Sequence, residues 1–382
     1  MPFATARHSS ARSRQKAPFN TTLGIYAPRK PCDPGIRLSQ RRRFERVTHL
    51  CHFSLRAQFR ARRVTFKTGQ KMPVSTFENA VDVRAEKSKT ALKFKVRPTG
   101  EAMITIPELA AEALGSHLAN HMSRRFGSTD PAAIERVQSA ARLAIDCIGN
   151  SDALYHNVEH TLLVTLVAYD ILRGRRLLSE TNANDFAHVI IACLFHDIGY
   201  VRGILKGDDE DGYIIDAAGN KAKLPRGSSD AALLPYHVDR SKLFVMHRFG
   251  SIKTLDANRI ANAIEFTRFP SPPGAGNIDS EEGELVRAAD LIGQLGDPHY
   301  LRKANALFYE FEEVGMNKQL GYTSPADLTD LYPKFYWGSI SPHIQSAIRY
   351  LNVTSSGRQW IANLYSNVFC AERELSLCGP EH

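Results

Sequence analysis

Apolar residues recur at helical spacing along most of the chain beyond Ile106. Strand-like alternation is rare in the same region. The stripes that define the expected helices cover Leu109–Met122, Ile134–Ile145 and residues 158–172, 184–198, 256–267, 282–296 and 340–352. The sequence therefore predicts an all-α helical bundle over residues 105–370.

One stretch between two of these helices departs from the helical pattern. Tyr213–Asp216 and Ala222–Leu224 are short β-prone runs, and Gly219–Asn220 between them is a turn sequence. The acidic run Asp208–Asp211 precedes the first of them. We expect a small β-hairpin inserted between two helices.

The basic charge of the chain is confined to its N-terminal part. Residues 1–71 carry 17 Lys and Arg against two acids, Asp33 and Glu45, which gives a net charge of +15. The other 311 residues carry 32 basic and 38 acidic side chains, a net charge of −6. Any binding of nucleic acid would therefore depend on residues 1–71 alone.

Residues 1–71 are rich in Arg and Ser and show no sustained period, as is typical of a disordered segment. Three interpretations remain open: an organelle transit peptide, a basic nucleic-acid-binding arm, or translated upstream sequence before a start at Met72. The abrupt change of composition at Met72 favours the third. We expect residues 72–104 to form a linker and residues 371–382 a C-terminal tail.

The cysteines and the apolar runs bear on the compartment. None of the six cysteines forms a CxxC pair, and Cys193 lies inside an apolar run, which favours a reducing environment. No apolar stretch approaches the ~20 residues that a membrane-spanning helix requires, and the N-terminus lacks the apolar centre of a secretory signal. We therefore expect a soluble, cytoplasmic protein without a membrane partner.

Two histidines open one of the apolar helices. His156 and His160 stand four residues apart in the segment Tyr155–His160, so they share one face of a helix. Two imidazoles one turn apart suit a shared metal ion, or one metal ligand beside one proton donor. Taken alone, this spacing is explained more simply by a solvated or hydrogen-bonded pair of histidines.

Two further helices carry acidic or imidazole groups among apolar residues. His196 and Asp197 end the run 186–195, and Asp290 interrupts the run 284–293. Simpler explanations are a helix C-cap at Gly199 and an ion pair between Asp290 and its neighbour Arg287. Separate burial of these groups would be costly at each site, so together they predict one shared metal centre. Their nitrogen and oxygen donors suit Zn, Fe, Mn or Mg.

These residues carry a resemblance to a known family. The order His160, His196–Asp197, Asp290 resembles the H…HD…D pattern of the HD superfamily of metal-dependent phosphohydrolases. The segment Tyr155–His160 resembles, more narrowly, the YHNxxH motif of class I cyclic nucleotide phosphodiesterases. The resemblance covers roughly residues 150–300 and implies a phosphodiesterase-like helical bundle.

The resemblance also implies roles for single residues. His160, His196, Asp197 and Asp290 would hold a first divalent cation, and Asp197 would bridge to a second, more hydrated one. His156 would be the general acid that protonates the leaving oxygen, while a hydroxide between the two cations attacks phosphorus.

Part of the chain departs from the phosphodiesterase pattern. The segment Tyr236–His247 is similar to the YNDxSVLENHH helix with one extra residue, but its acidic position falls on Phe244. The histidine of an HDxxH pattern is replaced by Tyr200. Both changes put in doubt the side chains that would orient the metal ligands.

Four more residues are candidates for supporting the ligands or contacting a substrate. Asn157 and His247 are the candidate supports, and Arg287 could grip a phosphate. Gln345 is the only glutamine near the position of the purine-binding glutamine of phosphodiesterases, although an exposed helical glutamine is the simpler interpretation.

The resulting hypothesis is a phosphohydrolase that uses two divalent metal ions and acts on a small-molecule phosphoester, in the first place a nucleotide phosphodiester. A nucleotidase or nucleoside triphosphate hydrolase could use the same ligands. The alternative from another class is a non-catalytic metal- or nucleotide-binding sensor. The departures at Tyr200 and Phe244 favour the sensor, whereas His156, a proton donor that a binding module does not need, opposes it.

Overall fold

The computed structural model describes residues 104–127, 130–269 and 280–377. Within these residues the all-α prediction is confirmed, since a two-stranded sheet is the only sheet they contain. The helices, with η marking short 3-10 or π-helical turns, are α2 (Ile106–Phe126), α3 (Pro131–Ile148), α4 (Val158–Leu178), α5 (Ala183–Phe195), η2 (Ile198–Tyr200), η3 (Asp230–Leu233), α6 (His237–Phe249), α7 (Ala257–Glu265), α8 (Glu281–Leu295), α9 (Tyr300–Glu313), α10 (Met316–Leu320), α11 (Pro325–Asp330), α12 (Tyr332–Phe335), η5 (Tyr336–Ile340), η6 (Ser341–His343), α13 (Gln345–Leu351) and α14 (Ser355–Leu377).

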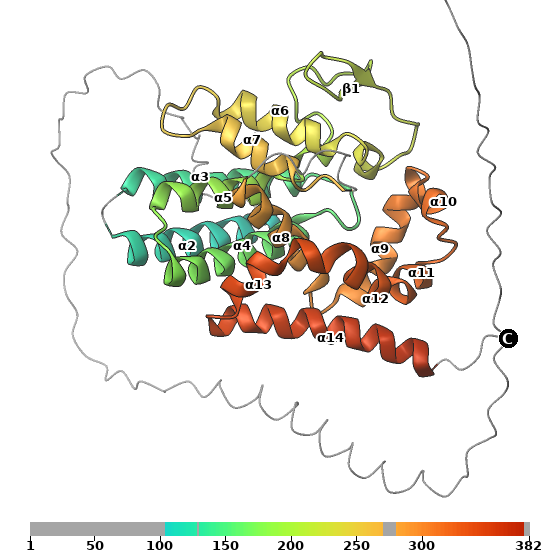
Figure 1. Ribbon diagram of the computed structural model, residues 1–382. Coiled ribbons are helices and arrows are strands. Elements are labelled where there is room, and N and C mark those ends of the chain that lie inside the picture. The colour runs from blue at the N-terminus through green and yellow to red at the C-terminus, as the bar shows by residue number, and fades with distance from the viewer. Residues whose placement is uncertain (1–103, 128–129, 270–279, 378–382) are drawn as a thin grey trace, which may run out of the picture. The chain divides into compact units, whose positions relative to one another are not determined.

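Helix α8 runs through the middle of the bundle (Figure 1). It packs against α4, α5 and α7, and also against α13 and α14, which lie below it in the view. Helices α2 and α3 pair with each other beside this centre, and α3 also contacts α5. Helices α4, α5 and α8 therefore meet in the interior, and any side chain that they direct toward one another is buried.

A close approach fixes how α4 and α8 cross. Gly293 on α8 lies against Val164 on α4, and a Cβ atom at Gly293 would come within 2.9 Å of the Val164 backbone. Real Cβ atoms do not approach backbone so closely, so glycine is required for this contact. His160 is one turn before Val164, and Asp290 is three residues before Gly293. The crossing thus brings these two side chains together.

The expected hairpin is present as β1 (Tyr213–Ile214) and β2 (Lys221–Ala222). The strands are antiparallel, with Tyr213 opposite Ala222. The carboxylate of Asp216 accepts hydrogen bonds from the backbone N–H groups of Ala218 and Asn220, which stabilises the turn between the strands.

Two predicted boundaries differ from the structure. The run 340–352 is not one helix, because Pro342 cannot continue the helical hydrogen bonding and the chain forms η5, η6 and α13 instead. Residues 371–377, expected as part of a tail, continue α14 because Ala371 extends its buried stripe. The expected N-terminal extension 1–71 and the linker as far as residue 103 lie outside the described residues, as do residues 378–382.

For the described residues, no helix combines the length and the apolar character needed to cross a membrane.

Candidate metal centre

The start of α4 is set by a helix cap. The side chain of Asn157 accepts hydrogen bonds from the backbone N–H groups of Glu159 (2.9 Å) and His160 (3.4 Å), and its own amide donates to the Leu154 carbonyl at 2.9 Å. Asn157 therefore acts as the N-cap of α4, which fixes where the helix begins. This cap places His156 just before the helix and His160 in its first turn.

Helix α5 carries the second pair of ligands to the interior. Every residue of 186–195 is buried, so the chain directly after it is also held inside the bundle. The Nδ1 atom of His196 donates a hydrogen bond to the Cys193 carbonyl at 2.8 Å. This bond fixes the tautomer and leaves Nε2 with its lone pair directed at the centre, as is common for metal-binding histidines.

The four predicted ligands converge on one point. Nε2 of His160 lies 3.3 Å from Nε2 of His196. Asp197 Oδ2 lies 3.3 Å from His160 and 3.0 Å from His196, and Asp290 Oδ1 lies 3.3 Å and 3.5 Å from the same two nitrogens. Ligand atoms bonded to one cation at ~2.0–2.2 Å stand about 2.9–3.6 Å apart. The spacing therefore fits the edges of a single coordination shell.

The chemistry of these atoms also fits a cation. Asp197 Oδ2 is buried and has no hydrogen-bond partner among the described residues. Burial alone would raise the pKa of Asp197, but His196 and His160 outweigh it and hold that pKa well below its usual value. Lone pairs and a carboxylate charge thus face one another in a buried site, and such a group needs a positive charge between its members. Two overlapping groups here could hold a metal ion, namely His156–His160–Asp197 and His160–His196–Asp290.

His156 lies beside this cluster and is held by a carboxylate that sequence reasoning missed. Glu310 on α9 is buried, and its Oε2 lies 2.5 Å from His156 Nδ1. Its Oε1 accepts from the backbone N–H groups of Tyr155 (2.6 Å) and His156 (3.2 Å). Burial alone would lower the pKa of His156, but Glu310 outweighs it and raises the pKa to about 9. The imidazole is therefore oriented and protonated at neutral pH.

Three aromatic rings form a wall beside the centre. The buried ring of Tyr200 stacks on His156, with centroids 4.6 Å apart, and on His237, with centroids 4.5 Å apart. His237 Nε2 lies 3.7 Å from Asp197 Oδ1, the oxygen that the four-ligand cluster does not use. The motif in the sequence marked His247, which lies on the same helix α6, as a candidate and did not mark His237.

Three of the other candidate residues are used elsewhere. His247 is exposed, as is Gln345, whose amide donates to the Ser341 carbonyl at 2.8 Å. Arg287 donates to the Phe266 carbonyl at 2.9 Å and lies 3.2 Å from His343 Nδ1, so the simple ion pair with Asp290 is not formed. Among the contacts of the described residues, none links His247 or Gln345 to the four ligands.

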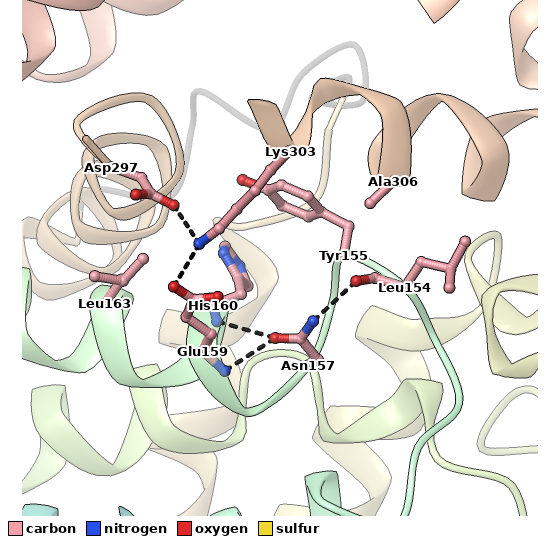
Figure 2. Close-up of a pocket in the computed structure, with 9 residues that line it drawn as sticks. All are labelled: Leu154, Tyr155, Asn157, Glu159, His160, Leu163, Asp297, Lys303 and Ala306. Atoms are coloured by element: carbon pink, nitrogen blue, oxygen red, sulfur yellow. Dashed lines mark hydrogen bonds and ion pairs between the residues drawn. The ribbon is translucent and has the colours of Figure 1, made fainter. Parts of the chain in front are cut away.

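A cavity of about 100 Å³ borders His160, and the other three predicted ligands are not among the residues that line it (Figure 2). Lys303 reaches into it from α9 and lies 2.5 Å from Asp297 and 2.7 Å from Glu159.

Comparison with family models gives one match, to the Npun_R2479-like family, over residues 104–374. The chain belongs to the Npun_R2479-like family. The match contains α2 to α13 and most of α14, so the four predicted ligands, Glu310 and His237 lie inside the matched residues. No curated protein matches the sequence.

Proposed function

We propose that this Npun_R2479-like protein is a metal-dependent phosphohydrolase that acts on a small-molecule phosphoester, in the first place a nucleotide phosphodiester. The observation that carries the proposal is the convergence of two imidazoles and two carboxylates at 3.0–3.5 Å, next to a histidine held by Glu310. A site that only stores a metal has no use for a separate, carboxylate-bound imidazole.

His160, His196, Asp197 and Asp290 would hold the first of two divalent cations, with Zn, Fe, Mn and Mg as the candidate metals. A divalent cation at such a site polarises a phosphoryl oxygen and lowers the pKa of water to near neutrality. The protein supplies a dry, preformed set of ligands, because α4, α5 and α8 bury all of them except part of Asp290.

His156 would be the general acid. Glu310 takes up Nδ1, so Nε2 is the nitrogen that can face a substrate. The pKa of about 9 keeps the ring protonated at neutral pH, and proton transfer from Nε2 would stabilise the leaving oxygen as the P–O bond breaks. The carboxylate of Glu310 accepts hydrogen bonds from the backbone N–H groups of residues 155 and 156, and these bonds hold this segment just before the start of α4.

The test measures metal content and hydrolysis together on the purified full-length chain. Bis(p-nitrophenyl) phosphate and cyclic AMP report diesterase activity, and p-nitrophenyl phosphate and ATP report the nucleotidase and triphosphatase alternatives. Asp197→Ala should lose both bound metal and turnover. Asp211→Ala, which removes an exposed acid from the hairpin insertion, is the control and should keep both.

Each outcome decides something. Metal-dependent turnover that disappears in Asp197→Ala supports the phosphohydrolase, and the preferred substrate separates diester from monoester or triphosphate. Bound metal without turnover on any of these substrates rejects the proposal and leaves the metal-binding sensor in its place.

A further inference from the structure

We infer that His237 is a protein ligand of a second divalent cation, which it shares with Oδ1 of Asp197. The inference rests on the proposed function, because it names a protein ligand for the second of the two cations proposed there. It differs from the resemblance to phosphodiesterases, which implies a second cation held mainly by water, and it assigns a role to a histidine that the motif did not mark.

The orientation of His237 is fixed by its own helix start. Nδ1 donates a hydrogen bond to the Leu234 carbonyl at 2.5 Å, so Nε2 carries the lone pair. That lone pair faces Asp197 Oδ1 at 3.7 Å. This distance is too long for a direct hydrogen bond, which needs about 3.2 Å or less between nitrogen and oxygen.

The spacing suits a shared cation. Two ligand atoms bonded at ~2.1 Å to one ion stand about 3.6–3.7 Å apart when the angle at the ion is near 120°. Asp197 Oδ2 is already directed at His160 and His196, whereas Oδ1 is directed at His237. The carboxylate therefore presents one oxygen to each of two neighbouring positions, as a bridging ligand does.

The helix that carries His237 cannot easily move away from Asp197. A Cβ atom at Gly199 would come within 2.0 Å of the His237 carbonyl, so α6 begins in direct contact with the η2 turn. Ser241 accepts a hydrogen bond from the Gly199 N–H at 2.8 Å, and the buried Arg240 donates to the Gly199 carbonyl at 2.7 Å. His237 is thus held at its position by the backbone around it, before any ligand binds.

This arrangement also gives a reason for Tyr200. Its ring packs between the imidazoles of His156 and His237 at near-parallel angles of 12° and 21°. The ring of Tyr200 separates His156, the proposed proton donor, from the proposed position of the second cation. It also holds the planes of both imidazoles fixed. An imidazole bonded directly to the second cation favours Zn or Fe over Mg, because Mg prefers oxygen ligands and keeps most of its water.

The test counts metal ions in the full-length protein. After loading with Zn²⁺ or Mn²⁺ and desalting, elemental analysis should give two ions per chain for the wild type and one for His237→Ala. His237→Phe keeps a ring against Tyr200 and should also bind one ion, which guards against a loss caused by collapsed packing. His247→Ala, an exposed histidine on the same helix, should keep two ions. Circular dichroism confirms that each variant is folded.

Crystals grown with Mn²⁺ supply a readout that does not depend on turnover. Anomalous scattering should show two peaks, one of them in bonding contact with both His237 Nε2 and Asp197 Oδ1. A folded His237→Phe protein that still binds two ions, or a wild type with a single peak, overturns the inference. If the wild type binds one ion and still hydrolyses phosphoesters, only this inference fails. If it binds two ions and hydrolyses none, only the proposed function fails.

Discussion

Two buried charged clusters are built around the same short segment, residues 196–201, and they are constructed differently. On one side is the candidate metal centre. On the other is a clamp in which the fully buried guanidinium of Arg240 meets Asp208 and three backbone carbonyls, those of Gly199, Val201 and Ile214. All five N–H groups of Arg240 have acceptors, at 2.5–3.1 Å.

The difference lies in the balance of donors and acceptors. In the clamp, Asp208 also accepts backbone N–H groups from Ile214 at 2.8 Å and Leu205 at 3.3 Å, so donors and acceptors match. In the candidate metal centre, acceptors face one another, and a buried oxygen of Asp197 has no hydrogen-bond partner in the part of the chain that the structure describes. A saturated network stabilises a fold, whereas an acceptor-rich network requires a cation or a proton. The comparison can be tested on both sides.

The largest effect is expected in the clamp. Asp208→Ala would leave the Arg240 charge buried without its partner, which typically costs about 3–5 kcal/mol of folding free energy. Asp211→Ala, in the same acidic run but exposed, should change stability by less than about 0.5 kcal/mol. Urea unfolding of the metal-loaded proteins measures both. Equal, small losses of unfolding free energy in the two variants would show that the clamp does not stabilise the fold.

Removal of the metal ion should give the next largest effect. It should act through the candidate metal centre and not through the clamp. A cation that binds the folded state alone stabilises it by about 2.7–4.1 kcal/mol at 100 to 1,000 times its dissociation constant. Treatment with a chelator should therefore lower the melting temperature of the wild type and leave Asp197→Ala unchanged. A wild type that melts at the same temperature with and without chelator would contradict the interpretation of the centre as a metal site.

A substitution of Glu310 tests the role of His156, the residue of the centre that is not a predicted metal ligand. Glu310→Gln keeps the shape but removes the charge that raises the pKa of His156, so kcat should fall about 10–100-fold, or about 1.4–2.7 kcal/mol. Because the proposed general acid is the protonated form of His156, wild-type activity should persist at neutral pH and decline as pH rises through about 9. In the variant this decline should begin nearer the ordinary histidine pKa. Unchanged metal content is the control, and an unshifted alkaline limb would mean that Glu310 only supports the fold.

Much of the centre could be predicted because its ligands interrupt apolar helices. His160, His196, Asp197 and Asp290 each place a polar group at a position where the helical period requires burial, and that conflict is visible in one sequence. The same period accounts for the bundle and for the hairpin that breaks it. The pairing of α4 with α8 through Gly293 was not visible, since it depends on a backbone contact between distant segments.

Two residues were missed for physical reasons. Glu310 is separated from His156 by 154 positions and sits among several acids at the end of α9. The feature that could have identified Glu310 is its position three residues after the buried Leu307, on the apolar stripe of the helix.

His247 was favoured over His237 by motif position alone. It follows Val245 by two residues, about 200° around the helix, so the phase of α6 turns it away from the core.

Proton competition gives the smallest effect and separates the two clusters most cleanly. Burial alone would lower the pKa of His196, but Asp197 and Asp290 outweigh it and raise that pKa well above its ordinary value, so the metal-free centre holds a proton there. A cation must displace this proton, and the affinity of the site for the cation should weaken about tenfold, or about 1.4 kcal/mol, for each unit by which the pH falls below the pKa of His196.

Calorimetric titration with Zn²⁺ in two buffers of different ionisation enthalpy measures the released proton. Asp208→Ala changes the clamp and none of the metal ligands, so it should show the same proton release per bound ion as the wild type. Zinc binding that is independent of pH would mean that the facing acceptors are not balanced by a proton when the metal is absent.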